Sequence, residues 1–442
     1  SVPGPMLVVC PGDRMIINLE NDLEEETNLH THGFHVSPRD NSDNIFLNIK
    51  PGERFTYEFD IPEDHPPGAY WYHPHQHVNL LEVEETRRSR VAAGGQVFAG
   101  MAGPMIVEGG LDAMPGIRDI PQRVLAIQNT QLGDDGRVVP QAEEADDSNT
   151  QLFVNGAINP EINIRPGELQ RWRIYNMNSD RFVNLRLEGQ EFQLLATDGN
   201  TLEQIQPVDE MLVAPGSRSE VLVRGGTPGS YKLEALPFTR FPGPGGSTSE
   251  ETVATLVSGD EPVDEGQDPA GPLEEQEDLR EVSVDRERSI LYSEDVSANP
   301  PKFFIDGKEF DHDRVDHTMR LGDVEEWTIT NDSDEWHTFH IHVNDFQLVE
   351  MDGKPVEGIS PQDNVSISPN GSVKMRMRFT DFTGKFVFHC HVLHHEDHGM
   401  MSVVEVVDSE AQDEPTNGAS GDPDHGGGEA QEATGSHHDE DH

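Results

Sequence analysis

The chain repeats itself three times, and this repeat restricts its fold more than any other feature. Three segments can be superposed, each with a short apolar run, a tight turn and a second run, and their turn residues are Gly12, Gly167 and Gly322. The two successive intervals are both 155 residues. A second turn recurs at residues 51–52, 215–216 and 370–371. Self-similarity at a fixed period indicates one structural unit built three times in tandem.

The repeated unit has the pattern of β-structure. Apolar and polar residues alternate, as at 54–59 and 373–379, between turn dipeptides, and no long stretch has helical periodicity. We therefore predict an all-β protein of three tandem Greek-key β-sandwich domains, at residues 1–112, 113–258 and 288–408. We expect an acidic linker at 259–287 and a disordered acidic tail at 409–442.

The charge balance excludes two classes of partner. The chain has 83 acidic and 31 basic residues and a formal net charge of −52, which repels nucleic acid and anionic membrane surfaces. Only 7 of the basic residues are Lys. A Lys-poor, carboxylate-covered surface favours a halophilic source, because counterions screen the self-repulsion. The alternative is an ordinary acidic protein with an acidic tail. No apolar run of about 18 residues is present, so we expect no membrane insertion.

Histidines occur in the first and third units and in the tail, and the second unit has none. The chain has 21 of them, and none lies between His77 and His312. The second unit therefore has neither His nor Cys, and any metal site must be built by the other two. Four clusters hold 13 of these histidines: His30 and His32; His73, His75 and His77; His337, His340 and His342; and His389, Cys390, His391, His394, His395, His398 and Met400.

Strand parity separates these clusters into two centres. Residues i and i+2 of a strand face one side, so each His-x-His pair presents two imidazoles together. In His389-Cys390-His391 the two imidazoles face one way and the thiolate faces the other. His340 and His342 share a face, whereas His337 has the opposite parity. The pattern indicates two metal centres on opposite sides of one strand.

The first centre has the ligands of a blue copper site. Cys390, His337, His395 and Met400 supply a thiolate, two imidazoles and a weak thioether, which is the type 1 set. The second centre has eight imidazoles in four His-x-His pairs, enough for three copper ions with two, three and three ligands. A single His-x-His pair is weak evidence, because exposed histidines are common. Four pairs around a His-Cys-His segment are strong evidence.

These clusters resemble those of the multicopper oxidases, the laccase-like family of three cupredoxin domains, over about residues 3–407. The flanking residues agree, at Tyr70–His75, Gly100–Met105 and His389–Met401. The resemblance implies three cupredoxin-type domains and four copper ions: one type 1, one type 2 and two type 3. The implied ligands are His30 and His340 for type 2, His32, His73 and His391 for one type 3 ion, and His75, His342 and His389 for the other.

Two positions depart from the family pattern. Thr338 stands where Pro is frequent and Val343 where Gly is frequent, and the usual opening strand before Pro3 is missing. These differences lie in loops and at an edge, so the expectation of copper binding stands.

Two carboxylates are candidates for proton transfer, because reduction of dioxygen to water consumes protons as well as electrons. Glu396 follows the type 1 ligand and matches a family acid implicated in proton delivery to the type 3 pair. Asp43 best matches a family Asp near the type 2 copper, with Asp40 as second choice. In so acidic a chain, a solvated surface carboxylate is the competing interpretation of each.

The resemblance implies oxidation of a small-molecule reductant coupled to dioxygen reduction. Met400 as axial ligand predicts a low to middling type 1 potential, which favours phenols and aromatic amines. A cuprous oxidase for copper tolerance is the alternative, although no methionine-rich insert is present. A non-catalytic copper-binding scaffold and a copper nitrite reductase are the remaining alternatives, but the first would lack ligands and the second needs fewer histidines.

The other histidines receive weaker predictions. His77 is expected near the ligands or in a channel, and His394 or His398 as an exposed imidazole beside the type 1 loop. We expect His35, His65, His312 and His317 to be surface residues. The tail histidines are expected to belong to a solvated acidic tail, with weak metal binding as the alternative: His425, His437, His438 and His442. Cys10 is expected to be a buried apolar filler in a strand.

The protein is expected to be extracytoplasmic and secreted. The chain starts at Ser1 in what reads as mid-domain sequence, so we expect that an N-terminal segment has been removed or left out. Three sequons, at Asn331, Asn364 and Asn370, would permit N-glycosylation in an exported protein.

Overall fold

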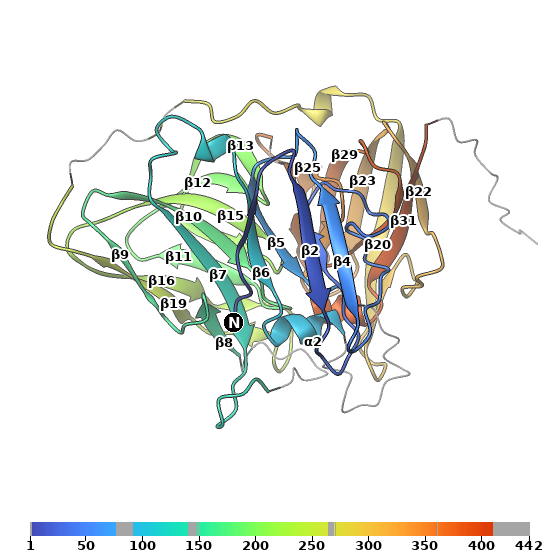
Figure 1. The fold of residues 1–442 in the computed structure, drawn as a ribbon, viewed down its shortest axis with the longest axis horizontal. Coiled ribbons are helices and arrows are strands. Elements are labelled where there is room, and N and C mark those ends of the chain that lie inside the picture. The colour runs from blue at the N-terminus through green and yellow to red at the C-terminus, as the bar shows by residue number, and fades with distance from the viewer. Residues whose placement is uncertain are drawn as a thin grey trace, which may run out of the picture. The chain divides into compact units, whose positions relative to one another are not determined.

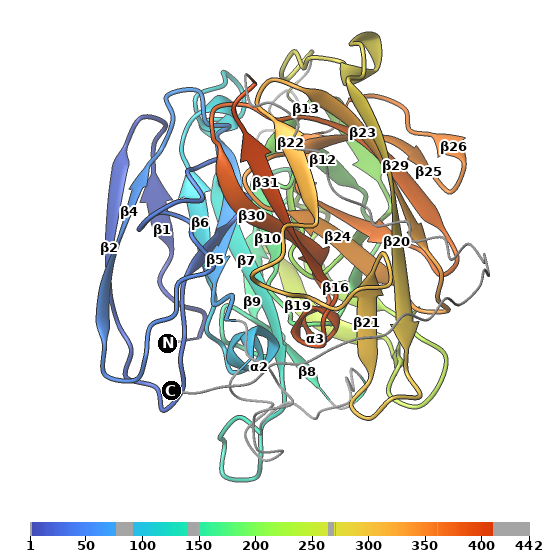
Figure 2. The same cartoon turned by 90° about the vertical axis from the view of Figure 1, so that its right-hand side faces the viewer.

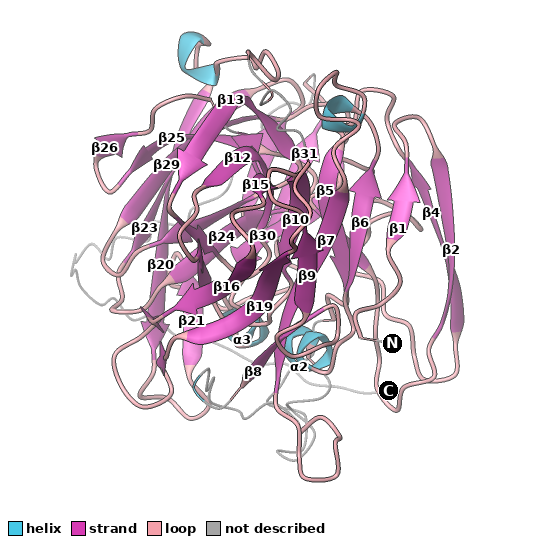
Figure 3. Cartoon of the chain, turned by 90° about the vertical axis from the view of Figure 1, so that its left-hand side faces the viewer, coloured by secondary structure: helices cyan, strands magenta, loops and turns pink. Residues whose placement is uncertain are grey.

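The computed structural model describes residues 2–76, 92–139, 148, 150–263, 269, 271–359 and 361–409. The expectations for His77 and for the histidines of the predicted tail lie outside these residues. Strands dominate the described chain, as Figure 3 shows in magenta. The two α-helices among these residues, α2 and α3, are each only about a turn and a half long, as the lack of helical periodicity predicts.

The first sandwich is built from a four-stranded sheet, in the order β1-β6-β5-β3, and a β2–β4 pair. Its elements are β1 (Leu7–Val9), β2 (Arg14–Glu20), β3 (His30–His32), β4 (Arg54–Asp60), β5 (Gly68–His73), α2 (Ala93–Phe98) and β6 (Gly103–Val107).

The second sandwich has a sheet in the order β13-β12-β15-β10-β7-β8 facing one in the order β14-β11-β16-β19-β9. Its strands are β7 (Gln122–Thr130), β8 (Gln151–Val154), β9 (Glu161–Ile164), β10 (Leu169–Asn176), β11 (Val183–Leu187), β12 (Phe192–Thr197), β13 (Asn200–Val208), β14 (Glu210–Val213), β15 (Arg218–Arg224), β16 (Gly229–Leu236) and β19 (Glu251–Ser258). A small hairpin, β17 (Phe238–Thr239) and β18 (Ser247–Thr248), stands apart.

The third sandwich has a sheet in the order β21-β20-β23-β29-β25-β26 and one in the order β22-β31-β30-β24-β28. Its elements are β20 (Arg286–Asp295), β21 (Lys302–Ile305), β22 (His317–Arg320), β23 (Val324–Asn331), β24 (His337–Ile341), β25 (Phe346–Met351), β26 (Lys354–Pro355), β27 (Pro361–Gln362), β28 (Asn364–Ile367), β29 (Ser372–Arg378), β30 (Gly384–Cys390), α3 (Leu393–Asp397) and β31 (Met401–Val407). Figure 1 shows these strands in yellow to red.

The sequence repeat appears as the same strand–turn–strand in each sandwich. The turns between β1 and β2, β9 and β10, and β22 and β23 contain Gly12, Gly167 and Gly322, whose φ angles of 83°, 80° and 94° favour glycine. The first strand of each pair runs parallel to the last strand of its sandwich: β1 to β6, β9 to β19 and β22 to β31. This return of the last strand beside the first is consistent with a Greek-key sandwich.

The predicted alternation is confirmed where it was most explicit. In β29 the buried residues Val373, Met375 and Met377 alternate with half-buried basic residues, and β4 buries Tyr57 and Phe59. Alternation buries one face of each strand and leaves the other for solvent.

The sandwiches share apolar contacts. Trp71 and Ala69 of the first pack in one buried cluster with Tyr175 and Met177 of the second, and Phe182 of the second lies in the core of the third. Helices α2 and α3, from the first and third sandwiches, lie next to each other (Figure 2). The Gly94 amide of α2 donates to the Asp397 carboxylate of α3 at 3.0 Å. The interfaces therefore belong to one continuous packed unit.

The predictions for Cys10 and His65 are wrong. Cys10 is exposed and follows β1 instead of lying in it, because its amide starts the turn to β2 by donating to Asp13 at 2.8 Å. His65 is buried between the rings of Phe34 and Tyr70, and its Nε2 accepts the His35 amide.

No helix among the described residues is long and apolar enough to cross a membrane.

A close backbone approach between the first two sandwiches predicts a sensitive position. A Cβ on Gly68 would collide with the backbone of Gly199, which cannot move aside as a flexible side chain would. We expect Gly68→Ala to lower the free energy of unfolding by about 1–3 kcal/mol and to lower the melting temperature in calorimetry. Gly259→Ala is the matched control, because its nearest new contact is 3.9 Å away. An unchanged melting temperature for Gly68→Ala would contradict this packing.

Candidate metal centre

The histidine clusters converge because the strands that carry them are paired. In the first sandwich β3 pairs with β5, so that His30 lies opposite His73. In the third, β24 pairs with β30, so that His340 lies opposite His389 and Phe339 opposite Cys390. Residues opposite each other in adjacent antiparallel strands share a face, so each sandwich presents its His-x-His pairs together.

Cys390 lies on the other side of β30, with two histidines. Its Sγ is 3.5 Å from Nδ1 of His337 and 3.5 Å from Nδ1 of His395, and the two Nδ1 atoms are 3.0 Å apart. All three side chains are buried. Met400 is fully buried as well, and its carbonyl accepts the Cys390 amide at 3.0 Å. The structure thus brings together the four residues predicted for the type 1 site.

The outer nitrogens of these histidines have hydrogen-bond partners. Nε2 of His337 lies 3.0 Å from the Ser333 hydroxyl, and Nε2 of His395 lies 3.0 Å from Oε1 of Glu335. Glu335 in turn pairs with the buried Arg240. Such partners leave Nδ1 of each ring facing the thiol and hold the ring in place.

The second cluster contains the eight histidines of the four His-x-His pairs, all buried. Nε2 of His389 is 3.1 Å from Nε2 of His75 and 3.3 Å from Nε2 of His342, which unites the three residues predicted for one type 3 ion. His30 stacks on His342 and His32 on His340, each pair with centroids 3.8 Å apart. The first and third sandwiches therefore interleave their rings.

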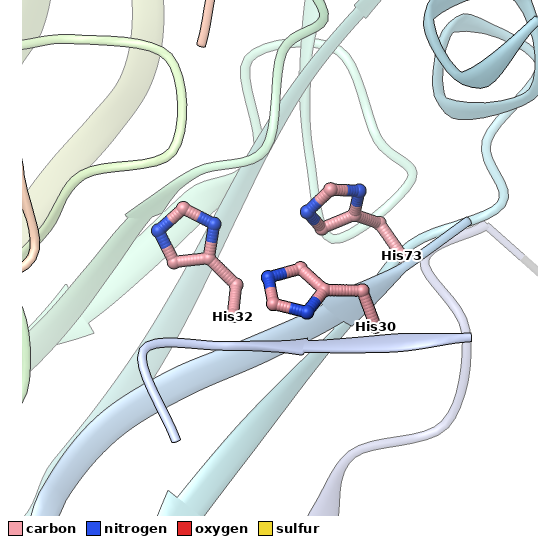
Figure 4. Close-up of side chains that lie close together, drawn as sticks. All are labelled: His30, His32 and His73. Atoms are coloured by element: carbon pink, nitrogen blue, oxygen red, sulfur yellow. The ribbon is translucent and has the colours of Figure 1, made fainter. Parts of the chain in front are cut away.

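The rings of His30, His32 and His73 point toward one another from β3 and β5 (Figure 4). Predicted partner His391 lies beside two of them, with its ring centroid 4.8 Å from that of His32 and 5.4 Å from that of His73. His30 also groups with His340 and His342, with one ring nitrogen of each within 4.8 Å of the others. The division of these rings between type 2 and type 3 ions stays a prediction.

Unpaired ring nitrogens test whether copper fits this cluster. Buried nitrogens without a hydrogen-bond partner occur on His30 (Nε2), His32 (Nδ1), His73 (Nε2), His340 (Nε2), His342 (Nδ1) and His391 (both). Burial lowers the pKa of all six rings, which favours the neutral form that ligates metals. Unpaired buried polar atoms are costly, and imidazole is a good copper ligand. The donor set fits copper.

Asp43 lies behind one of these rings. Its carboxylate is 2.9 Å from Nδ1 of His30 and accepts the Thr31 amide at 2.9 Å. Burial raises the pKa of Asp43 to about 7. The second choice, Asp40, is exposed at a turn, where its backbone carbonyl accepts from the Asn44 side chain at 3.2 Å.

Glu396 lies behind the other end of the cluster. Its carboxylate is 2.8 Å from Nδ1 of His389 and 3.5 Å from Nδ1 of His75. It also lines a cavity of about 910 Å³, together with Phe310 and His398. Glu396 therefore connects two candidate ligands with a space large enough for water.

The remaining predicted imidazoles near the type 1 loop are half-buried, not exposed. His394 and His398 pack against each other with centroids 4.4 Å apart, and both face Phe303.

Sequence reasoning missed two pairs of residues: Arg218 with Asp363, and Arg240 with Glu335. Asp363 contacts His32 and His340, and Glu335 contacts His395. These acids have no distinguishing motif in a chain with 83 acidic residues, so no signal in the sequence singles them out.

The sequons differ in accessibility. The side chains of Asn331 and Asn364 are buried and donate to backbone carbonyls of Glu335 and Pro215, whereas Asn370 is exposed. Only Asn370 of the three is open to modification in the folded protein.

Comparisons with known proteins give one consistent family. Three family profiles, each described as multicopper oxidase, match residues 1–111, 121–257 and 284–410. Among curated proteins, the multicopper oxidase mco of Staphylococcus aureus is 28% identical over 417 residues, which cover 91% of this chain and 82% of the relative.

Solved structures agree in fold. A multicopper oxidase from Campylobacter jejuni, described as a metallo-oxidase, superposes with a TM-score of 0.79 at 29% identity and covers 92% of this chain and 86% of its own. A bacterial laccase-like multicopper oxidase from Ochrobactrum sp., with oxidase activity towards lignin model compounds, has a TM-score of 0.77 at 25% identity, with 92% and 91% covered.

The buried thiol predicts how copper loading depends on pH. Burial raises the pKa of Cys390 to about 12 and lowers that of His337 and His395, so at neutral pH the metal-free site holds a protonated thiol and two neutral rings. A metal binds the thiolate, so binding releases one proton. We expect the apparent Cu(I) affinity to rise about tenfold per pH unit between about pH 7 and 10, in chelator competition.

The Cys390→Ser variant is the control for this measurement, because it removes the titrating thiol. Any Cu(I) affinity that this site keeps in the variant should not rise tenfold per pH unit. A pH-independent affinity of the unmodified site would contradict the assignment of Cys390 as a ligand.

Proposed function

The chain belongs to the multicopper oxidase family of dioxygen-using oxidoreductases, and from this premise we propose that it is a laccase-like member. It would take single electrons from phenols or aromatic amines at a type 1 copper and reduce dioxygen to water at a trinuclear copper cluster.

The observation that supports this proposal most strongly is the position of Cys390 between two histidines of the other cluster. His389 and Cys390 are neighbours on β30 and face opposite sides, toward the eight-histidine cluster and toward His337 and His395 respectively. An electron that arrives at a metal held by Cys390 would therefore have only the width of strand β30 to cross before it reaches the eight-histidine cluster. The copper ions, when bound, supply the one-electron steps and the reduction of dioxygen.

The chain's own residues would handle the protons. Glu396 faces the cavity on one side and His389 on the other, so it can carry protons from cavity water toward the cluster. Asp43 accepts from His30 and Thr31 and orients the His30 ring. Both roles are part of the proposal.

Aromatic side chains beside the type 1 residues favour an organic donor. Trp336, which directly precedes His337, lies 5.4 Å from the ring of Phe238, and Phe238 stacks on Phe182 at 5.1 Å. Trp336 and Phe238 are only half-buried. A phenol or aromatic amine can stack on such a surface. The activity of the Ochrobactrum relative towards lignin model compounds agrees with this donor class.

Oxidation of a metal ion, such as Cu(I), is the second candidate, and it has its own observation. Glu294 lies 3.9 Å from Nε2 of His337 and Glu335 lies 3.0 Å from Nε2 of His395, and the buried Oε2 of Glu294 has no hydrogen-bond partner. Burial, followed by the charge of Glu335, raises the pKa of Glu294 to about 7. A bound cation would stabilise the ionised form of Glu294 and give its buried oxygen a ligand to contact. The Campylobacter relative, which is described as a metallo-oxidase, agrees with this candidate.

We further propose an extracytoplasmic enzyme that works at high salt. The net charge of −52 and the scarcity of Lys support the salt adaptation, and the use of copper supports export.

Oxygen uptake by the copper-loaded enzyme in high salt tests the proposal. We expect faster uptake with 2,6-dimethoxyphenol than with Cu(I), and no nitrite reduction. Faster uptake with Cu(I) would select the second candidate, and absence of uptake with both donors would contradict an oxidase.

Replacement of Glu396 tests its proton role. Glu396→Gln keeps the size of the side chain but cannot transfer a proton, so we expect reoxidation of the reduced enzyme by dioxygen to slow by about 100-fold. Anaerobic reduction by the donor should be unchanged, because it does not consume protons at the cluster. Stopped-flow absorption separates the two steps.

Glu309→Gln is the matched control. Glu309 lines the same cavity but is half-exposed and pairs with Lys302, so its loss should alter neither step appreciably. Equal reoxidation rates in Glu396→Gln and the parent enzyme would exclude the proton role.

A further inference from the structure

A charged side chain of the second sandwich, Arg218, lies beside the eight-histidine cluster, although that sandwich has no histidine of its own. Arg218, at the start of β15, donates from Nη1 to Oδ1 of Asp363 at 2.8 Å and from Nη2 to Oδ2 at 2.6 Å. Both side chains are almost fully buried, at 0% and 1% exposure. This is a bidentate guanidinium–carboxylate pair, which fixes the carboxylate in orientation as well as in position.

Asp363 contacts a histidine of the first sandwich, His32, through its carboxylate, and a histidine of the third, His340, through its backbone carbonyl and, at 3.4 Å, through Oδ1. Its Oδ1 is 2.9 Å from Nε2 of His32, on β3. The carbonyl oxygen of Asp363 accepts from Nδ1 of His340, on β24, at 2.8 Å. Asp363 therefore holds two rings that stack on each other and that come from different sandwiches.

These hydrogen bonds determine which nitrogen of each ring can bind a metal. A neutral imidazole has one N–H, so a ring that donates from one nitrogen presents the lone pair of the other. His32 donates from Nε2 and His340 from Nδ1, which leaves His32 Nδ1 and His340 Nε2. These two atoms are among the buried nitrogens without a partner. The orientation imposed by Asp363 thus selects the atoms available to a metal.

In a different arrangement, His32, His340 and Asp363 would themselves bind a metal, since their ligand atoms lie within 4.8 Å of one another. Both oxygens of Asp363 already accept from Arg218, however, so a cation there would lie beside a buried guanidinium. The repulsion between two buried positive charges disfavours that arrangement.

Arg218 is fixed from several directions. Its Nε donates to the carbonyl of Ala69 on β5 at 2.9 Å, and its amide donates to Asp198 at 2.8 Å. The backbone of Gly33 passes so close that a Cβ there would collide with both Arg218 and Asp363, and its φ is +83°. Gly33 directly follows His32, so the pair also explains why a glycine ends that cluster.

We propose that Arg218 and Asp363 are positioning residues for the trinuclear cluster, which they serve by fixing the rings of His32 and His340. The sandwich without copper ligands would thereby take part in building the copper site. This inference rests on the proposed function, because it assumes that these histidines bind copper.

The test compares Asp363→Asn and Arg218→Lys with the parent enzyme, each loaded with copper. Asn keeps the shape of Asp but cannot hold Arg218 as a carboxylate does, and Lys cannot form the two-pronged contact. We expect the type 2 electron paramagnetic resonance signal and the near-ultraviolet type 3 absorption to be lost or altered, with less copper per chain. The blue absorption from Cys390 should remain, and oxygen uptake should fall by about 10- to 100-fold.

Arg171→Lys is the matched control for loss of a buried ion pair. Arg171 belongs to the same sandwich, is equally buried and pairs with Glu220 and Asp112. It should lower the melting temperature while leaving the type 2 and type 3 signals unchanged. If Arg218→Lys does not fold, Asp363→Asn alone carries the comparison.

Unchanged type 2 and type 3 signals in Asp363→Asn would overturn the inference, and so would an equal change in Arg171→Lys. A parent enzyme without blue absorption or near-ultraviolet absorption would instead contradict the proposed function itself.

Discussion

The alternation of side chains along β30 is the constraint on which both centres depend. Because successive residues of a strand face opposite sides, the thiol of Cys390 reaches His337 and His395 while its neighbour His389 reaches His75 and His342. A helix would not separate adjacent residues in this way. The third sandwich must therefore keep β30 in the middle of its sheet, between β24 and β31, where pairing on both sides prevents a slip in register.

Burial is the second constraint, because the eight buried imidazoles are stable only if each ring nitrogen has a hydrogen-bond partner or a metal. The outer nitrogens that have partners meet carboxylates or carbonyls: Asp43 for His30, Asp363 for His32 and His340, and Glu396 for His389. The inner nitrogens are left for copper. Buried charges that would be costly alone are compensated in pairs, as with Arg218 and Asp363. Burial by itself would raise the pKa of Asp363, but the charge of Arg218 holds that pKa below its usual value.

The fold and the ligand clusters could be predicted from sequence because they rest on local periodicity. The period of two, the repeated turn glycines and the His-x-His spacing are all readable within a few residues of each other. The residues that hydrogen-bond to the ligands could not be predicted from sequence, because Arg218 and Asp363 are 145 residues apart and meet only after two sandwiches dock. Burial of individual residues was missed for the same reason. His65 is enclosed by Phe34 and Tyr70, and Cys10 is left exposed by the turn it starts, and neither follows from residue type.

Anomalous diffraction from a copper-loaded crystal, collected on both sides of the copper absorption edge, tests the central claim most directly. We expect four copper peaks: one among Cys390, His337 and His395, and three within the eight-histidine cluster, with Asp363 hydrogen-bonded to histidine rings and not bound to metal. No peak within the histidine cluster, or a peak bound by Asp363, would contradict it.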